Sequence, residues 1–310
     1  MFFLSPKRRS LFWALSSASS GDPSMIGKDR TNWERFFRAI NINYDHVWQI
    51  PDYSWTLMFS PPIPKFDLSA GPIKNNLFMI GMSLSNRAPA DERYYALKPA
   101  TGEVKDPSRR FDFDFDAIVS LLRKKTKNKD AGAGWITGSC PLMWIYFNKI
   151  FEETGESFDL GEDSFIGFAG GWKTFKGLEV PKPQFRARMT EILNIPDKNI
   201  RDVYSFTETD VILGECEYHN LHVSPWGDII IRDVETLEPV KTGEKGLVNI
   251  INPLANSYAG VSLLQDDIAR IVMEDGCPCG RHGKVVEVFG RAEGAEAKGC
   301  GANIADMAGL

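Results

Sequence analysis

The chain has 310 residues, of which 43% are apolar and 25% are charged, and its formal net charge is −5. This composition is typical of a globular protein of about two domains, or of one large α/β unit with a smaller lobe. The negative charge argues against a nucleic-acid-binding protein, which would present a basic face. No apolar run approaches the roughly 18–20 residues that cross a bilayer, so we expect no membrane span.

The first residues, MFFLSPKRRSLFWALSSASSG, superficially resemble a secretory signal peptide. Their order is wrong, because apolar residues precede the basic cluster and LFWAL is shorter than the usual apolar region of about 7–15 residues. The five cysteines are an odd number that does not suit a disulfide framework. We therefore expect a cytoplasmic protein whose thiols are ordinary cytosolic thiols, metal ligands or catalysts.

The rest of the chain is predicted to alternate helices and strands and then to become β-rich. In chain order the expected elements are a helix over 31–50, with Thr31 and Asn32 as its candidate caps, strands in 51–64 and 75–84, an alternating segment leading into a helix over 111–134, a helix over 141–158, a strand in 163–171, a helix over 182–196 and a strand in 200–210. The stretch 222–251 alternates apolar and polar residues between turns, which predicts antiparallel strands. The expected fold class is mixed α/β.

A serine-rich segment, LSSASSGDPS, follows the first apolar stretch at residues 15–24. Hydroxyl groups and a glycine can surround an anion, since glycine lets the backbone approach it closely. A flexible linker is the alternative interpretation of the same composition. The segment is not a Walker A loop, because no Gly-Lys-Ser/Thr follows it.

Four segments resemble, in order and approximate spacing, the motifs of the adenylate-forming superfamily, which activates carboxylates with ATP. They are the segment from Ser16 to Pro23, VYSFTETD, SLLQDDIARI and VFGRAEGAEAKG. The resemblance implies a large N-terminal α/β domain with a β-rich subdomain. Two departures lie in the first segment, where Ala18 replaces the family's glycine and Asp22 its lysine. Alanine restricts the backbone and aspartate repels phosphate, which puts efficient use of ATP in doubt.

The resemblance also implies roles for individual residues around ATP and Mg²⁺. Glu208 would hold Mg²⁺, Thr207 would donate to a phosphate, and Tyr204 would flank the adenine or the acyl site. The phosphates would lie against Ser16, Ser17, Ser19, Ser20 and Gly21.

Further along the chain, the resemblance implies that Asp267 accepts from the ribose hydroxyls, with Asp266 as the adjacent alternative. A carboxylate facing two hydroxyl groups makes strong charge-assisted hydrogen bonds. Arg291 would contact ribose or phosphate. The adenine would lie on Gly170 and Gly171, although a tight turn with positive φ explains these glycines equally well.

Two short cysteine- and histidine-containing segments suggest a metal site. ECEYHNLH contains Cys216 and His222 with five residues between them, and His219 as a competing ligand. CPCGRHG contains Cys277 and Cys279. Three thiolates and one imidazole are the ligands of a tetrahedral structural Zn²⁺, so we expect zinc here; two unrelated groups of thiols are the alternative.

Within the superfamily the chain is similar to the acyl-protein synthetases of the LuxE type, from about Ser16 to Cys300. The resemblance implies that acyl-AMP is formed from ATP and a carboxylic acid, that the acyl group moves to Cys300, and that a partner reductase then receives it. Lys298 would lower the pKa of Cys300. We expect a fatty acid as the substrate, while two rivals remain open: an adenylating enzyme of secondary metabolism and a degenerate, non-catalytic fold.

The same resemblance sets the expected domain organisation. We expect an α/β core that binds ATP and the acid over 1–212, a β-rich subdomain over 213–289, and a hinge remnant with the cysteine tail over 290–310. The mobile C-terminal domain of longer members is expected to be absent, together with its catalytic lysine. The family's N-terminal helices are also expected to be missing.

Cys140, in the segment GSCPL, is expected to be a buried apolar thiol rather than a ligand.

Overall fold

The computed structural model describes residues 12–15, 25–49, 52–60, 62, 87–100 and 111–292. The chain divides into two compact units, which we describe separately. The α/β unit contains the described residues between 51 and 201, and the β-rich unit contains those of 1–50 and 202–292.

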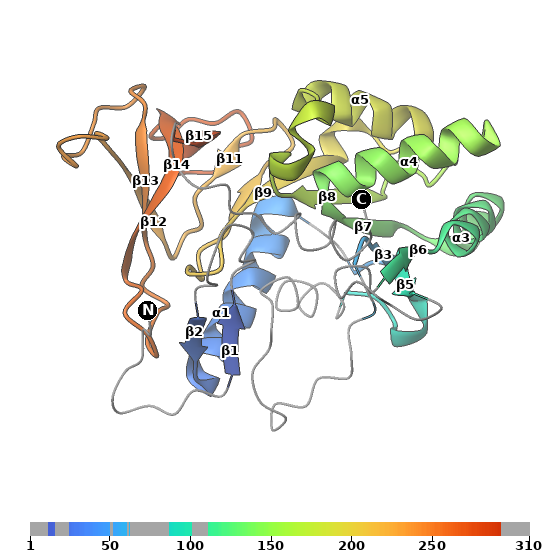
Figure 1. The fold of residues 1–310 in the computed structure, drawn as a ribbon, viewed down its shortest axis with the longest axis horizontal. Helices are drawn as coiled ribbons and strands as arrows, with labels where there is room; N and C mark the ends of the chain where they lie inside the picture. Colours follow the sequence, from blue (N-terminus) through green and yellow to red (C-terminus); the bar gives the residue numbers. More distant parts are fainter. Residues whose placement is uncertain are drawn as a thin grey trace. The chain divides into compact units, whose positions relative to one another are not determined.

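The α/β unit is built on parallel strands in the order β8-β7-β3-β4. Helices follow β7 and β8 in the chain, and Figure 1 shows the two helices α4 and α5 side by side. The strands of this unit are β3 (Trp55–Met58), β4 (Arg93–Tyr95), β5 (Leu97–Pro99), β6 (Phe111–Phe113), β7 (Gly134–Ser139) and β8 (Phe165–Ala169). Its α-helices are α3 (Phe115–Lys127), α4 (Cys140–Thr154) and α5 (Lys182–Leu193). Short 3₁₀ turns span Ala90–Glu92, Lys129–Ala131, Lys173–Leu178 and Asp197–Asn199.

The β-rich unit carries an antiparallel sheet in the order β12-β13-β14-β15-β11-β10-β9, of which β9 begins in the α/β unit (Figure 1). The strands are β9 (Ile200–Tyr204), β10 (Leu213–Glu215), β11 (Leu221–His222), β12 (Asp228–Arg232), β13 (Gly246–Ile251), β14 (Ser262–Met273) and β15 (Val285–Arg291). A separate hairpin pairs β1 (Phe12–Leu15) with β2 (Met25–Lys28), and α1 (Arg30–Asn43) continues into one π-helical turn over Tyr44–Trp48.

Apolar side chains from six strands form the core of the β-rich unit. Its members include Leu213, Ile231, Val248 and Ile250, which are at most 1% exposed. Burial alternates along β12, where Ile229 and Ile231 are buried and their neighbours in the strand are more exposed, so one face of the sheet packs into the core. The core therefore supports the strands and strand ends that carry most of the candidate site residues.

The mixed α/β class predicted from the sequence is confirmed, and so are the helices within 31–50, 111–134, 141–158 and 182–196. One detail is wrong: Thr31 and Asn32 do not cap the first helix. Asp29 does, because its carboxylate accepts the backbone N–H of Asn32 at 2.8 Å, which satisfies an unpaired donor of the first turn. The strand expected within 75–84 lies outside the described residues. Among the residues that are described, no helix is long and apolar enough to cross a bilayer.

Candidate functional site

Most of the described candidate residues lie in the β-rich unit, and only Gly170 and Gly171 belong to the α/β unit. The predicted residues that lie outside the described part of the chain are Ser16, Ser17, Ser19, Ser20, Gly21, Lys298 and Cys300. The site is therefore built below from the end of β9 and the turn after it, from the middle of β14 and the end of β15, and from the loops that follow β10 and β14.

Thr207 and Glu208 form a tight turn after β9. The backbone N–H of Thr209 donates to the carbonyl of Phe206 at 3.2 Å, which closes the turn. Thr207 is 4% exposed, whereas Glu208 is only partly buried. Within the described part of the chain, the Glu208 carboxylate makes no hydrogen bond or ion pair. Its oxygen atoms are suited to act as ligands of a hard cation.

Tyr204, Asp267 and Arg291 meet across neighbouring strands. The Tyr204 hydroxyl donates to Oδ2 of Asp267 at 2.7 Å. Arg291 pairs with Asp267 in the register of β14 and β15, and its Nε lies 3.8 Å from Oδ1 of Asp267. The side chain of Asp267 is 16% exposed, against 62% for Asp266. The Tyr204 hydroxyl thus orients Asp267, and Arg291 lies beside both Asp267 and Asp266.

Burial, together with the charge of Asp267, raises the pKa of Tyr204 well above its ordinary value. The hydroxyl therefore keeps its proton at all physiological pH values and acts as a donor to Asp267. This contact fixes the orientation of the carboxylate without adding a second negative charge.

Gly170 follows β8 in the α/β unit and has a φ of +82°. A side chain at this position would be strained, so the turn itself explains the glycine. Its proposed role under an adenine ring remains a prediction.

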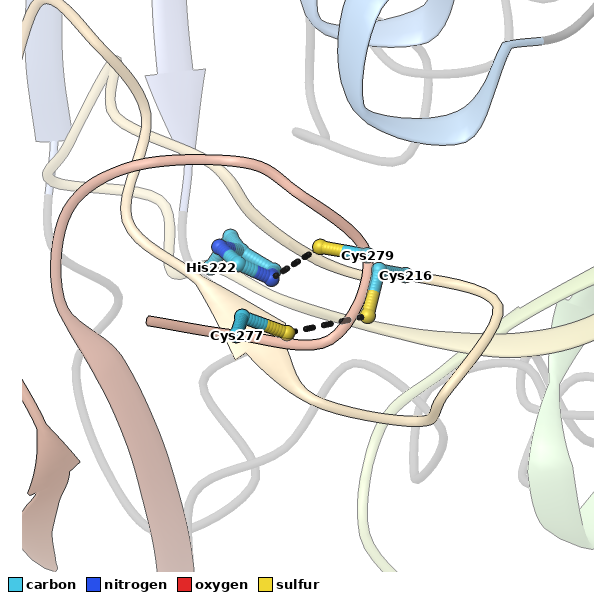
Figure 2. Close-up of side chains that lie close together, drawn as sticks. All are labelled: Cys216, His222, Cys277 and Cys279. Carbon is cyan, nitrogen blue, oxygen red and sulfur yellow. Dashed lines mark hydrogen bonds between the residues drawn. The ribbon is translucent and has the colours of Figure 1, made fainter. Parts of the chain in front are cut away.

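Cys216, His222, Cys277 and Cys279 lie together at one end of the antiparallel sheet, as Figure 2 shows. Their possible ligand atoms all lie within 4.8 Å of one another. Cys216 directly follows β10, His222 ends β11, and the other two cysteines lie in the loop between β14 and β15. His219 is not in this group, and its Nδ1 lies 3.6 Å from the Glu215 carboxylate.

Two distances in this cluster are close to the edges of a zinc tetrahedron. The sulfur atoms of Cys216 and Cys277 are 3.9 Å apart, and Sγ of Cys279 is 3.3 Å from Nε2 of His222. Zinc–sulfur and zinc–nitrogen bonds of ordinary length would give edges of about 3.8 and about 3.6 Å. Burial lowers the pKa of His222, with help from the Arg281 charge, so the imidazole is neutral as a ligand must be.

Burial raises the pKa of Cys216 to about 12. An apolar pocket without a cation would keep this thiol protonated, and a bound divalent ion would supply the missing charge. The donor set is therefore suited to zinc.

A buried polar cluster next to the Glu208 turn was missed from the sequence. It is formed by Lys28, Asp210 and Tyr258, which are 0%, 2% and 5% exposed. Asp210, the second acid of the segment TETD, was a signal for this cluster in the sequence. Nothing in the sequence showed its partners, because they come from segments far away along the chain.

Comparisons with known proteins agree on one family. The family model described as "Acyl-protein synthetase, LuxE" matches residues 9–308. The long-chain-fatty-acid–luciferin-component ligase of Vibrio harveyi is 27% identical over 288 residues, which cover 92% of this chain and 69% of the relative. The enzyme of the same name from Aliivibrio fischeri is 27% identical over 297 residues, covering 95% of this chain and 72% of the relative.

The similar solved structures are adenylate-forming ligases. An open conformation of 2-hydroxyisobutyryl-CoA ligase, in complex with 2-HIB-AMP and CoA, superposes with a TM-score of 0.60 at 15% identity. ATP-bound MatB from Rhodopseudomonas palustris gives a TM-score of 0.52 at 13% identity. They match 94% and 90% of this chain, but the chain spans only 55% and 47% of their own lengths. At these identities the likeness shows the fold, and it agrees with the fold expected from the four motifs.

Proposed function

The chain belongs to the acyl-protein synthetase family LuxE, and from this premise we propose that it activates a long-chain fatty acid with ATP and carries the acyl group on Cys300. The observation that carries the proposal is the family match over residues 9–308, because this range includes all four motifs and the cysteine. The relatives from Vibrio harveyi and Aliivibrio fischeri are long-chain-fatty-acid–luciferin-component ligases.

The proposed reaction has two steps. A carboxylate oxygen of the acid attacks the α-phosphorus of ATP, the bond to the β-phosphate oxygen breaks, and pyrophosphate leaves. The thiolate of Cys300 then attacks the carbonyl carbon of acyl-AMP, the bond to the phosphate oxygen breaks, and AMP leaves. Cysteine suits the second step because its thiolate is a strong nucleophile and its thioester stays reactive. Lys298 would favour the thiolate by its charge, and a partner reductase would then take the acyl group.

The geometry around Glu208 and Asp267 supports the first step. Glu208 would hold Mg²⁺ through its carboxylate, and the ion would neutralise phosphate charge when bound. Thr207 would donate to a phosphate from the same turn. Asp267, oriented by Tyr204, would accept from the ribose hydroxyls, with Arg291 beside it.

The remaining predicted ATP contacts are proposed on the family resemblance. These are the phosphate contacts of Ser16, Ser17, Ser19, Ser20 and Gly21 and the adenine contact of Gly170 and Gly171.

A direct experiment incubates the protein with Mg·ATP and a labelled fatty acid and measures its intact mass. The proposal predicts the addition of one acyl group per chain, dependent on ATP and removed by neutral hydroxylamine, which cleaves thioesters. Absence of any acyl addition with acids from short to long, together with release of free acyl-AMP, would instead favour an adenylating enzyme without the transfer step.

Replacing Tyr204 with phenylalanine is expected to raise the KM for ATP by about tenfold, because a hydrogen bond to a charged group is lost. The KM for the acid should change little, since Asp267 is assigned to the ribose. The measurement is steady-state ATP–pyrophosphate exchange, with Tyr53→Phe, a buried tyrosine of the α/β unit, as the matched control. Equal KM values for ATP in both variants would contradict the assigned role of Asp267 and Tyr204.

We also propose that Cys216, His222, Cys277 and Cys279 bind a structural Zn²⁺. Four protein ligands fill a tetrahedral shell and leave no position for a substrate, so the ion would act on stability. It would join the loop after β10 to the loop between β14 and β15.

A Cys277→Ser variant is expected to lose about one zinc ion per chain and to unfold about 5–10 °C lower than the parent protein. The loss of stability follows because the bound ion contributes its binding free energy to the folded state. Elemental analysis and thermal unfolding measure the two effects, and Cys140→Ala, which removes a buried thiol of the α/β unit, should keep the metal. Purified protein that contains no zinc and is insensitive to chelators would rule out this site.

We place the reaction in the cytoplasm, because the proposed chemistry needs a reduced Cys300 and the cytosol keeps thiols reduced.

A further inference from the structure

A fully buried ion pair lies beside the Glu208 turn in the β-rich unit. Lys28 Nζ donates to Oδ1 of Asp210, and both side chains are 0% exposed. Asp210 also accepts from Nδ2 of Asn32 at 2.9 Å. A buried pair of charges adds little net stability, but each charge strongly requires its partner. The pair therefore fixes the geometry of the segments that carry it.

The hydroxyl of Tyr258 connects this pair to the backbone of Glu208. It lies 2.9 Å from the Glu208 carbonyl oxygen and 2.9 Å from Oδ2 of Asp210, and it accepts from Nδ2 of Asn252 at 2.9 Å. One hydroxyl proton serves one acceptor at a time, so the two oxygens share it. Burial, followed by the Asp210 charge, raises the pKa of Tyr258 well above its ordinary value, and the proton is retained.

The other end of the cluster is the strand that follows the serine-rich segment. Lys28 is the last residue of β2, which begins at Met25, directly after Ser24 in the sequence. Its ammonium group lies 5.3 Å from the ring of Phe36 and 5.5 Å from the ring of Tyr258, within the range of a cation–π interaction. Ser257 adds a hydrogen bond to the Gly27 carbonyl at 3.2 Å.

We propose that Lys28, Asp210 and Tyr258 are positioning residues that fix the Glu208 turn against β2. The turn contains Glu208, whose carboxylate we assign to Mg²⁺. Strand β2 directly follows the serine-rich segment that we assign to the phosphates. The cluster thus holds the Glu208 turn at a constant separation from β2, the strand that directly follows the proposed phosphate segment in the sequence.

This consequence for ATP rests on the proposed function, whereas the anchoring of the turn does not. Misplacement of a binding group by about 1 Å can cost two orders of magnitude in rate, so a rigid link between the two elements has a functional value. None of the three residues needs to touch ATP for this effect.

Hydrogen–deuterium exchange of the intact protein tests the anchoring without substrate. In Tyr258→Phe, the amides of residues 205–210 are expected to exchange about tenfold faster than in the parent, while β13 keeps its protection. The matched control is Tyr146→Phe, which removes a hydroxyl from a ring that is 4% exposed in the α/β unit. Exchange of residues 205–210 within twofold of the parent would overturn the proposal.

The same variant tests the consequence for ATP. Its KM for Mg·ATP is expected to rise about fivefold or more, while the KM for the acid stays within about twofold, since a general loss of stability would affect both. An unchanged KM for Mg·ATP in a variant with a loosened turn would refute the positioning role. A parent protein that activates no acid would refute the proposed function, and the exchange measurement would still decide the anchoring.

Lys28→Met probes the ion pair itself, but it leaves Asp210 buried without a partner and can fail to fold. The double variant Lys28→Met/Asp210→Asn removes both charges and keeps similar volumes. It should fold and show the same faster exchange in residues 205–210. Parent-like exchange in a folded double variant would show that the pair does not position the turn.

Discussion

A Cys300→Ser variant is expected to lose nearly all covalent acylation while keeping acid-dependent ATP–pyrophosphate exchange. The serine hydroxyl is not ionised near neutral pH and is a far weaker nucleophile than a thiolate, so acyl transfer should fall by at least about 100-fold. Formation of acyl-AMP does not involve the thiol and should be unaffected. Intact mass and exchange, measured on the same preparation, separate the two steps.

The controls for this variant are the other thiols. Cys140 is 4% exposed in the α/β unit, so Cys140→Ala should accept one acyl group like the parent. A Cys300→Ser variant that still carries a hydroxylamine-sensitive acyl group would move the acceptor to another residue. Loss of exchange together with acylation would show instead that Cys300 serves the first step or the fold.

A Glu208→Gln variant is expected to lose about 100-fold or more of its kcat for ATP–pyrophosphate exchange and to require more Mg²⁺ for half-maximal rate. An amide keeps an oxygen but lacks the charge that a hard divalent cation prefers. Electrostatic stabilisation of the phosphate charge contributes most to the rate of phosphoryl-type transfers. The variant reduces this stabilisation.

Titration with Mg²⁺ distinguishes this effect from a loss of fold. Glu191→Gln is the matched control, because Glu191 is an exposed acid of the α/β unit. It pairs only with Arg188, three residues earlier on the same helix, among the ion pairs of the described residues. Such surface pairs contribute about 0–1 kcal/mol, so this control should behave like the parent. A Glu208→Gln variant with an unchanged Mg²⁺ dependence would contradict the assigned ligand.

The elements that sequence reasoning predicted are those with a clear apolar period and clear boundaries. Helix α4 follows from a dense apolar run after Pro141, and the helix is capped by Gly155, whose φ is +66°. The metal ligands could be proposed because Cys277 and Cys279 are close in sequence and because Cys216 and His222 share a second short segment. Spacing over a short stretch of sequence was sufficient to predict both helix α4 and the metal ligands.

The missed features are long-range polar contacts. Lys28 and Asp210 are 182 residues apart, and Tyr258 reaches Glu208 across 50 residues. A single sequence contains no signal for such pairings, since a lysine and an aspartate are ordinarily surface residues. The cap of α1 was misplaced for a simpler reason: Asp29, Thr31 and Asn32 are all good capping residues within one turn.

The most direct measurement of the central claim is ATP–pyrophosphate exchange by the purified protein across a panel of carboxylic acids of increasing chain length. The account predicts exchange that requires both Mg²⁺ and the acid and that is greatest with long-chain fatty acids. Absence of exchange with every acid, in a folded protein, would contradict it.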